Sequence, residues 1–451
     1  MISPIRRKGR RWLRHPARIV PIAFAVHVTL GTLLLMLPVS RQGPGSAPLL
    51  TALFTATSAG CVTGLAVVDT ATYWSPFGHV VLLVLMQVGG FGIMAMASLL
   101  GLTIARRLGL TGRLVAVAET HSTGLGDLKN VLMRVAVFTV ITEVAVAAVL
   151  AGRFWLAYGY SPAYSVWLGT FHSISGFNHT GFSLFSDNMV GFVADWWICL
   201  PLIVAIIAGS IGFPVVYELS RRGNRPSRWS THTRITVFGT IALLATGFAA
   251  MLTLEWSNPK TFGPLDIPAK ILAALFQGTS PRTAGYNSVD FGQMHSETLL
   301  VTDWLMFIGG GSAGTSGGIK ITTFFLLAFV IWAEIRSERD VVAGRRRIAE
   351  ATQRQAVTVA LLGVALVALG TIALLMLTDE PLDRVFFEAT SAFATVGLTT
   401  GITPTLPPAA QIVLIILMYV GRVGTVTIAS ALALSERRTL YRYAEERPIV
   451  G

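Results

Sequence analysis

Charged residues are scarce in this sequence. They make up 13% of its 451 residues, while 53% are hydrophobic. A water-soluble domain carries about 25% charged residues, so this composition excludes an ordinary soluble protein. No acidic residue precedes Asp69, whereas seven Lys and Arg lie between Arg6 and Arg18. Because no convincing small-residue cleavage site follows the apolar segment 19–38, we expect a retained membrane span and not a signal peptide.

Cysteine is also scarce. Cys61 and Cys199 are the only two, and both lie in apolar stretches, which excludes a disulfide framework. Paired carboxylates or a Cys/His set at membrane depth are missing too, so we expect no enzyme and no prosthetic group. His172 and His179 could be read as metal ligands, but no carboxylate or cysteine lies at a metal-ligand spacing from them in the sequence.

The net charge of +12 could suggest a nucleic-acid partner, but the placement of the basic residues indicates membrane orientation instead. Most of the 35 Lys and Arg lie in the N-terminal tail, in the C-terminal tail and in alternate loops between apolar segments. By the positive-inside rule this side is the cytoplasm, which places both termini there. The loops on the opposite side are acidic, for example at Asp187 and Glu255. We therefore expect membrane lipids around the protein and no nucleic acid.

A segment of similar shape occurs four times. Each copy has an apolar run with an aromatic residue, then small and hydroxyl residues, then a glycine: 51–65 (TALFTATSAGCVTGL), 170–182 (TFHSISGFNHTGF), 274–286 (ALFQGTSPRTAGY) and 385–398 (VFFEATSAFATVGL). A proline precedes each glycine by 16 to 19 residues, at Pro48, Pro162, Pro268 and Pro381. A proline at a helix start, a short helix and a glycine turn predict one unit used four times around a centre.

These units predict the fold. A short helix such as 48–59 reaches only about 18 Å at about 1.5 Å per residue, so it enters the membrane and returns. Apolar segments of about 20 residues flank it and cross the bilayer. We expect an all-α membrane protein of four covalently linked repeats with pseudo-fourfold symmetry, each repeat a span, a re-entrant pore helix and a span, which gives eight transmembrane helices. Its parts are a cytoplasmic tail at 1–18, repeats at 19–113, 130–222, 235–336 and 355–435, and a second tail at 436–451.

The glycine turns carry the expected chemistry. Non-helical backbone at membrane depth survives only where it lines a polar cavity or lies inside protein. Four such turns around one axis would aim carbonyl oxygens at a common line, and rings of carbonyls replace the water around a dehydrated cation. The short helices would also direct the negative ends of their dipoles there. The predicted ion-binding residues are Val62, Thr63, Gly64, Asn178, His179, Thr180, Gly181, Thr283, Ala284, Gly285, Thr395, Val396 and Gly397.

The segments TSAGCVTGL, SPRTAGYNSVD, SAFATVGLTTGIT, GGSAGTSGGIK and MYVGRVG resemble the Trk/Ktr/HKT superfamily of potassium transporters. The resemblance covers nearly the whole chain and is closest to the Ktr-type membrane subunit, because the chain begins directly at the first repeat. It implies potassium uptake across the cell membrane, with K⁺ as the transported ion at the filter residues. The second filter, FNHTG, departs at His179 from the more usual FNNAG. In the plant branch of the superfamily, a serine in place of the first filter glycine implies a preference for sodium. This chain has glycine there, at Gly64, which points to potassium. A sodium-selective or sodium-coupled conductor of the same family is the alternative.

Six glycines in ten residues, at 309–318 (GGGSAGTSGG), interrupt the expected returning span of the third repeat. At about 1 kcal/mol per glycine relative to alanine they forfeit about 6 kcal/mol of helix preference, so the helix should break there. A small-residue face for helix packing is the other reading, but it needs spaced glycines. The resemblance implies an intramembrane gate beneath the filter, formed by Gly309, Gly310, Gly311, Ser312, Gly314, Thr315, Gly317, Gly318, Lys320 and Arg422.

Arg422 is the only charged residue of the apolar segment 412–433. An arginine at the centre of a span costs about 2.5 to 3.5 kcal/mol on insertion scales and normally faces inward. Snorkelling to the interface is the alternative. By resemblance Arg422 projects into the pore below the filter as an electrostatic barrier.

Four further predictions concern single positions. Glu143 is either a proton-relay group or a carboxyl paired with another helix. Arg282 should hydrogen-bond to backbone carbonyls or to Asp290. One phenylalanine in each short helix should pack in the core: Phe54, Phe171, Phe276 and Phe387. Four tryptophans should form a belt at the outer membrane interface: Trp155, Trp196, Trp197 and Trp304.

The resemblance also implies partners. The family works as a homodimer on a cytosolic ring of nucleotide-binding regulatory subunits. The cytoplasmic loops of this chain are short, so a nucleotide would bind only to such a separate regulatory subunit. The expected location is the cell (inner) membrane, which the chain crosses several times with both termini in the cytoplasm.

Overall fold

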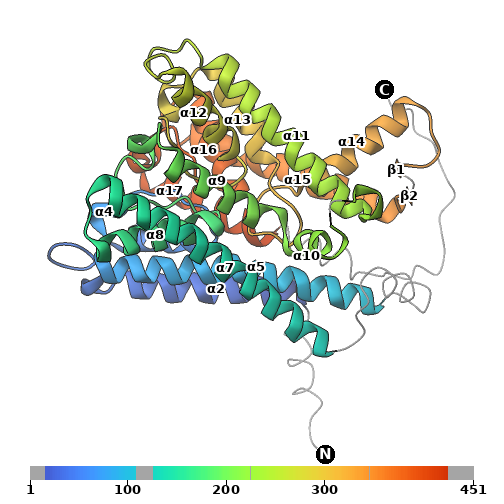
Figure 1. Ribbon diagram of the computed structural model, residues 1–451, viewed down its shortest axis with the longest axis horizontal. Coiled ribbons are helices and arrows are strands. Elements are labelled where there is room, and N and C mark those ends of the chain that lie inside the picture. Colours follow the sequence, from blue (N-terminus) through green and yellow to red (C-terminus); the bar gives the residue numbers. More distant parts are fainter. Residues whose placement is uncertain (1–15, 108–124, 224, 345, 425–451) are drawn as a thin grey trace, which may run out of the picture.

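The computed structural model describes residues 16–107, 125–223, 225–344 and 346–424, and nearly all regular structure there is helical (Figure 1). The helices are α2 (Pro16–Leu35), α3 (Leu49–Gly60), α4 (Thr70–Tyr73), α5 (Pro76–Arg107), α7 (Leu125–Tyr158), α8 (Pro162–Phe177), α9 (Trp196–Ile211), α10 (Phe213–Arg222), α11 (Thr231–Leu254), α12 (Ile267–Thr279), α13 (Ser296–Phe307), α14 (Ile321–Ile335), α15 (Glu350–Leu375), α16 (Leu382–Ala394) and α17 (Pro408–Tyr419). Short 3₁₀ turns are η1 (Pro38–Ser40), η2 (Val190–Phe192), η3 (Pro226–Arg228), η4 (Phe291–Gln293) and η5 (Thr403–Thr405), and η6 (Val420–Gly424) is a π-helical turn. The predicted tail at 436–451 and most of that at 1–18 lie outside the described residues.

Four short helices, α3, α8, α12 and α16, stand at the positions predicted for the re-entrant segments. Pro48 and Pro381 directly precede α3 and α16, Pro162 is the first residue of α8, and Pro268 is the second residue of α12. Proline is accommodated there because the first N–H groups of a helix have no partner within it. The predicted role of the four prolines as helix starts is confirmed.

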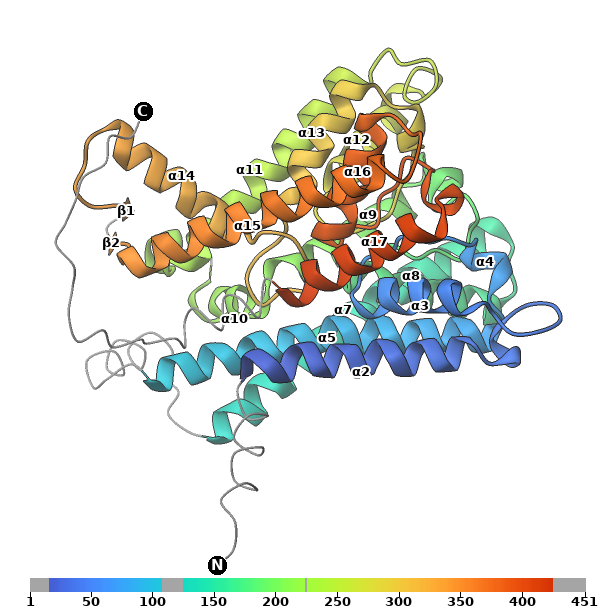
Figure 2. The ribbon, with the colours of Figure 1, turned by 180° about the vertical axis from the view of Figure 1, so that it is seen from behind.

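The helices pack in a closed cyclic order. Each short helix lies against the long helix before it: α3 on α2, α8 on α7, α12 on α11 and α16 on α15. The helix that follows each short helix packs against the short helix of the next group: α5 on α8, α9 on α12, α13 on α16 and α17 on α3. The last of these contacts joins the C-terminal group to the first. In both views α2 and α5 lie side by side along one edge (Figures 1 and 2).

A short strand pair was not predicted. β1 (Val342–Ala343) and β2 (Arg346–Arg347) pair antiparallel in the connection between α14 and α15. α14 packs on α11 and α15, and its far end lies with the strand pair at one side of the molecule in both ribbon views (Figures 1 and 2).

Three helices, α7, α11 and α15, are long and apolar enough to cross a membrane in the described part of the chain. The pair α9 and α10 would form a fourth span, but the two helices bend by 96°. The apolar segment 196–217 is therefore not one straight helix, since it is broken between α9 and α10. Gly212 adopts a φ of +86° and Pro214 follows as the second residue of α10, a combination that ends one helix and starts another. In the third group the predicted break is present, since residues 308–320 separate α13 from α14.

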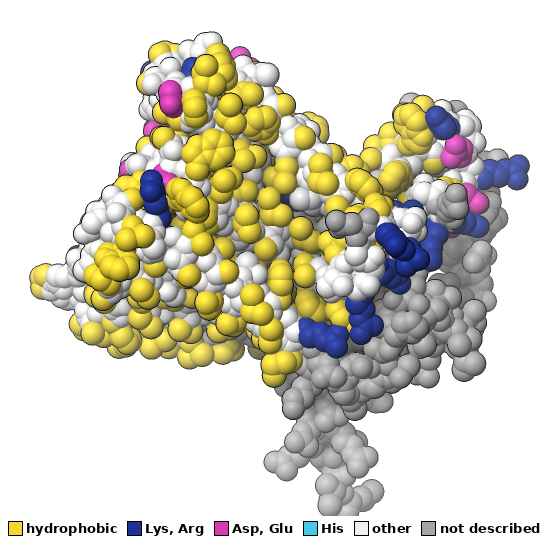
Figure 3. All heavy atoms as spheres, viewed as in Figure 1, with side chains coloured by type: hydrophobic (Ala, Val, Ile, Leu, Met, Phe, Trp, Pro, Cys, Tyr) yellow, Lys and Arg dark blue, Asp and Glu magenta, His cyan; other side chains and the backbone are white. Residues whose placement is uncertain are grey.

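The surface separates hydrophobic and basic regions. Figure 3 shows a face that is mostly hydrophobic, with Lys and Arg gathered near α10, the start of α11 and the β1–β2 pair. Arg221 and Arg222 lie at the end of α10, Arg228 lies in η3 shortly before α11, and Arg347 lies in β2. Two of the predicted basic loops therefore lie at the same end of the molecule.

The predicted packing aromatics are confirmed. Phe54, Phe171, Phe276 and Phe387 are each at most 1% exposed. The four tryptophans expected on the outside are 39% to 67% exposed: Trp155, Trp196, Trp197 and Trp304. They face outward, as aromatic side chains at a membrane interface do.

Candidate functional site

Each short helix ends in a turn of the same backbone shape. The residue two positions before each glycine has a φ of 51° to 67°, and the glycine itself has a φ of 68° to 97°, at Val62 and Gly64, His179 and Gly181, Thr283 and Gly285, and Thr395 and Gly397. Positive φ is easy for glycine but exceptional for β-branched residues such as valine and threonine. Contacts with the surrounding protein must therefore hold these turns in place.

A serine near the end of each short helix supplies part of that support: Ser58, Ser175, Ser280 and Ser391. In all four, the serine carbonyl accepts the N–H of the residue before the glycine at 2.7 to 2.9 Å. The Ser58 hydroxyl also accepts the N–H of Gly64 at 2.9 Å, and the Ser391 hydroxyl accepts that of Gly397 at 3.1 Å. The Ser175 and Ser280 hydroxyls instead donate to the carbonyl of the residue after the glycine. These serines were not predicted, although they recur five or six residues before each glycine.

The four turns meet at one place in the structure. A methyl group on the first glycine, Gly64, would strike the carbonyl oxygen of Thr180 in the second turn. A methyl group on Gly181 would lie 2.5 Å from Cα of Gly285 in the third turn. A methyl group on Gly285 would lie 2.7 Å from the carbonyl oxygen of Val396 in the fourth turn. On the fourth glycine it would strike the carbonyl oxygen of Thr63 in the first turn. The predicted filter residues of four distant segments therefore lie in a closed ring, with main-chain oxygens at the contacts.

Behind the second turn, Asn178 belongs to a buried polar group. Its amide donates to Glu143 Oε1 at 3.1 Å and to Gln87 Oε1 at 2.8 Å. The Gln87 amide lies 3.4 Å from the other oxygen of Glu143. These bonds direct the Asn178 side chain toward α5 and α7 and fit the reading of Glu143 as a carboxyl paired with other helices.

The side chain of His179 contacts protein groups on both sides of its ring. Nε2 lies 2.7 Å from the carbonyl oxygen of Ile206 in α9. Nδ1 lies 2.9 Å from the hydroxyl and 3.1 Å from the carbonyl oxygen of Thr283 in the third turn. Within the described residues no group of three or more His, Cys, Asp or Glu is placed to hold a metal ion.

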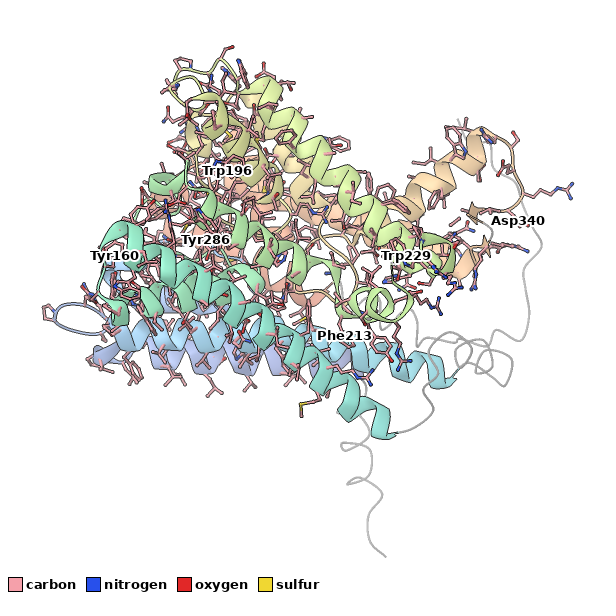
Figure 4. All side chains as sticks on the ribbon, viewed as in Figure 1. Tyr160, Trp196, Phe213, Trp229, Tyr286 and Asp340 are labelled. Carbon is pink, nitrogen blue, oxygen red and sulfur yellow. The ribbon has the colours of Figure 1, made fainter. Side chains whose placement is uncertain are left out.

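Tyr286, directly after the third glycine, lies within the helices (Figure 4). Its hydroxyl is 3.2 Å from the carbonyl oxygens of His172 and Phe182 in the second group. His172 in turn accepts the N–H of Leu184 at its Nε2, at 3.2 Å. The second and third turns are therefore joined on their outer side as well as at the ring.

Arg282 is buried beside the third turn. Its Nη1 and Nη2 each lie 3.4 Å from a backbone carbonyl oxygen, that of Thr240 in α11 and that of Gly309 in the glycine-rich loop. The predicted bonding to carbonyls is confirmed. In the described part of the chain no hydrogen bond joins Arg282 to Asp290, whose carboxylate accepts the N–H of Gly292 at 2.8 Å.

The glycine-rich loop closes on itself at its base. The N–H of Gly309 donates to the carbonyl of Ile319 at 2.8 Å, and the N–H of Ile319 donates to that of Phe307 at 3.1 Å. Near its far end Lys320 donates from Nζ to the carbonyl of Ser316 at 2.5 Å. The helix break predicted at 309–318 is therefore an ordered loop with paired ends.

The middle of the loop occupies the break between α9 and α10. The N–H groups of Gly311 and Thr315 donate to the carbonyls of Ser210 and Gly209 at 2.8 and 3.1 Å. These carbonyls are free to accept because α9 ends at Ile211, and the last carbonyls of a helix have no partner within it. The unpredicted bend at Gly212 thus provides the binding site for the loop.

The loop also touches the ends of two short helices. The Thr315 hydroxyl donates to the carbonyl of Phe177 at 3.0 Å. A methyl group on Gly317 would strike the hydroxyl of Thr395 and the carbonyl oxygen of Ala394. The predicted gate residues therefore lie directly against the second and fourth turns.

Arg422 lies in the π-helical turn η6 and is 2% exposed. Its Nη1 donates to the carbonyl of Thr315 at 2.5 Å. Among the described residues its Nε and Nη2 have no hydrogen-bond partner. The snorkelling alternative is wrong, since the side chain is directed to the buried loop and away from the surface.

Comparison with known proteins identifies the family. The family model TrkH, described as "Cation transport protein", matches residues 7–438. The chain belongs to the TrkH family. It is 37% identical over 442 residues to the Ktr system potassium uptake protein B of Bacillus subtilis, and the aligned region covers 98% of each chain. It is 36% identical over 435 residues to the protein of the same name from Vibrio alginolyticus, covering 96% of this chain and 94% of the relative.

The fold is also that of a TrkH family member. The structure of the potassium transporter TrkH from Vibrio parahaemolyticus matches with a TM-score of 0.72 at 19% identity, covering 91% of this chain and 83% of that one. The resemblance predicted from five segments is confirmed. Together with its apolar helices, TrkH family membership makes this chain a multi-pass cell-membrane protein with a helical transporter fold.

A buried carboxylate that was not predicted supports the fourth turn of this TrkH family member. Glu388 in α16 is 0% exposed. It accepts hydrogen bonds from the hydroxyls of Thr399 and Thr403 at 2.5 and 2.7 Å and from the N–H of Thr400 at 3.0 Å. Its position in the otherwise apolar segment VFFEATSAF is the signal that could have found it.

Glu255 holds the loop after α11 in a similar way. It accepts the N–H of His295 at 3.0 Å and the hydroxyls of Thr298 and Thr261 at 2.5 and 2.6 Å, and the Asn258 amide at 2.7 Å. Burial raises the pKa of this carboxyl, but the hydrogen bonds outweigh burial and hold it below the usual value.

Proposed function

We propose that this chain takes up potassium ions across the cell membrane through the ring formed by its four glycine turns. The cyclic contact of Gly64, Gly181, Gly285 and Gly397, with carbonyl oxygens at the contacts, is the observation that carries the proposal. A dehydrated cation needs such oxygens on several sides at once. The two relatives reported above are named potassium uptake proteins, which supports K⁺ as the ion.

The electrostatics of the ring favour a cation. All four short helices end at the turns, so their C-terminal dipole ends, equivalent to about half a negative charge each, are directed to the centre. A membrane potential that is negative inside supplies about 2.3 kcal/mol per 100 mV to each entering charge. Uptake then needs no chemistry in the protein beyond selective dehydration.

The cyclic helix packing supports four repeats, each made of a span, a pore helix and a span. In this arrangement the broken helices α9–α10 and α13–α14 are the returning spans of repeats two and three, and the chain crosses the membrane eight times. The end of the molecule where basic side chains gather then faces the cytoplasm, with both termini on that side.

The glycine-rich loop with Lys320 and Arg422 is the gate of this pathway. It lies against the second and fourth turns, and the charge of Arg422 opposes a cation that has passed the ring. Opening requires the loop to release the α9 carbonyls. The relatives' names refer to a Ktr system, which supports regulation by a further component; we take a homodimer on a cytosolic nucleotide-binding ring as the assembly.

Flux into liposomes tests the proposal. Purified protein should carry Rb⁺ or K⁺ faster than Na⁺, and excess K⁺ should inhibit Rb⁺ uptake. Gly64→Ser should lower the K⁺/Na⁺ flux ratio, because its Cβ would strike the Thr180 carbonyl oxygen and serine at positive φ adds a strain of about 1 to 3 kcal/mol. Equal or faster Na⁺ flux in the wild type, or Rb⁺ uptake unaffected by excess K⁺, would reject potassium in favour of a sodium conductor of the same family.

A further inference from the structure

The second and third turns lack a support that the first and fourth turns have. In turns one and four a serine hydroxyl accepts the N–H of the filter glycine. In turns two and three the corresponding hydroxyls bond instead to the carbonyls of Phe182 and Tyr286. Thr283 nevertheless keeps a φ of +67°, which is exceptional for a β-branched residue and has to be stabilised by its neighbours.

The imidazole of His179 bridges these two turns. The Ile206 carbonyl can only accept, so the Nε2 that lies 2.7 Å from it carries the proton. In the neutral ring Nδ1 is then an acceptor, and it takes the hydroxyl proton of Thr283 at 2.9 Å. Since Nδ1 has no proton to give, the nearby Thr283 carbonyl oxygen, at 3.1 Å, keeps its lone pairs for an ion.

The imidazole is fixed on its other side by packing. A methyl group on Gly209 would approach Cδ2 of His179 to 3.1 Å, so α9 leaves the ring little room to move. The residue is buried completely and lies between α9 and the third turn. Packing against α9 therefore keeps the ring in place, and its Nδ1 is the end that holds the hydroxyl of Thr283 in the third turn.

We propose that His179 is a positioning residue for cation selectivity, which fixes the third filter turn through the hydrogen bond from the Thr283 hydroxyl to Nδ1. This inference rests on the proposed function. The side chain does not touch the ion. It determines where the Thr283 carbonyl stands, and thereby the size of the ring and the difference in affinity between K⁺ and Na⁺.

Two replacements of His179 separate the two ends of the imidazole. Asparagine places its amide where Nδ1 lies and keeps an acceptor for Thr283, whereas glutamine places its amide near Nε2 and keeps only the bond to Ile206. Thr283→Val removes the hydroxyl and keeps the shape. Thr139→Val is the matched control, because Thr139 is a buried threonine of α7 whose hydroxyl has no hydrogen-bond partner among the described residues.

The measurement is the K⁺/Na⁺ flux ratio in liposomes, which does not depend on the amount of protein inserted. His179→Gln and Thr283→Val should each lower the ratio about tenfold, as expected when a hydrogen bond of about 1.4 kcal/mol is lost. The double variant His179→Gln with Thr283→Val should have a K⁺/Na⁺ flux ratio no lower than that of either single variant. His179→Asn and Thr139→Val should keep the wild-type ratio within about threefold.

Wild-type ratios in both Thr283→Val and His179→Gln would overturn the inference, and so would losses that multiply in the double variant. If His179→Gln does not fold, Thr283→Val alone decides. Absence of K⁺ flux in the wild type would instead reject the proposed function and leave these ratios undefined, so the two failures are distinguishable.

Discussion

Replacement of Arg422 by methionine should raise K⁺ flux through the protein in the absence of any regulator. Methionine keeps much of the length of the side chain but removes the charge and the bond to the Thr315 carbonyl. A hydrogen bond from a charged donor contributes about 1.5 to 3 kcal/mol to holding the loop. Two like unit charges about 8 Å apart repel by about 2 kcal/mol at an effective dielectric constant of about 20, which is equivalent to roughly 30-fold in rate and sets the scale for the barrier.

Lysine at the same position separates the two contributions, because it retains the positive charge but not the planar guanidinium. The assay is tracer Rb⁺ uptake into liposomes at a fixed membrane potential, with monodispersity in detergent as the control for folding. We expect at least a tenfold rise for Arg422→Met and a rise of less than threefold for Arg422→Lys. An unchanged or lower flux in Arg422→Met would refute the barrier, and equal rises in both variants would refute its electrostatic origin.

Two further predictions concern stability. Gly278→Ala should destabilise the protein by about 1 to 3 kcal/mol, because its Cβ would lie 2.5 Å from the backbone nitrogen of Phe248; Gly152→Ala, with nothing within 4 Å, is the control and should be neutral or stabilising in thermal unfolding. The pKa of Glu255 is lowered in the folded protein. The ionised carboxylate therefore stabilises the fold at a pH above the usual carboxyl pKa of 4.5, and this stabilisation is lost as the pH falls through the folded-state pKa. The midpoint of thermal unfolding should therefore fall less between pH 5 and 3 in Glu255→Gln than in the wild type, and equal falls would contradict this role.

The short helices and the glycine turns were predictable because each depends on local signals. A proline at the helix start and a glycine at the turn act through the backbone of their own segment. The break at 309–318 was predictable for the same reason, since six glycines outweigh the helix preference of their neighbours.

The bend at Gly212 and the role of His179 were not predicted, for different reasons. The signal for the bend, Gly212 followed by Pro214, was in the sequence, but it lay within a segment whose hydropathy favoured one continuous span. The position of His179 depends on Thr283, which is 104 residues away, and on a carbonyl in α9. No local pattern reports which side chains meet across four turns.

The most direct test of the ring is the position of a heavy monovalent cation in an experimental structure. Crystals or cryo-EM grids prepared with Tl⁺ or Rb⁺ should show ion density on the axis between Gly64, Gly181, Gly285 and Gly397, within coordination distance of main-chain oxygens from all four turns. Density that is bound elsewhere, with the ring unoccupied at saturating ion, would contradict the account.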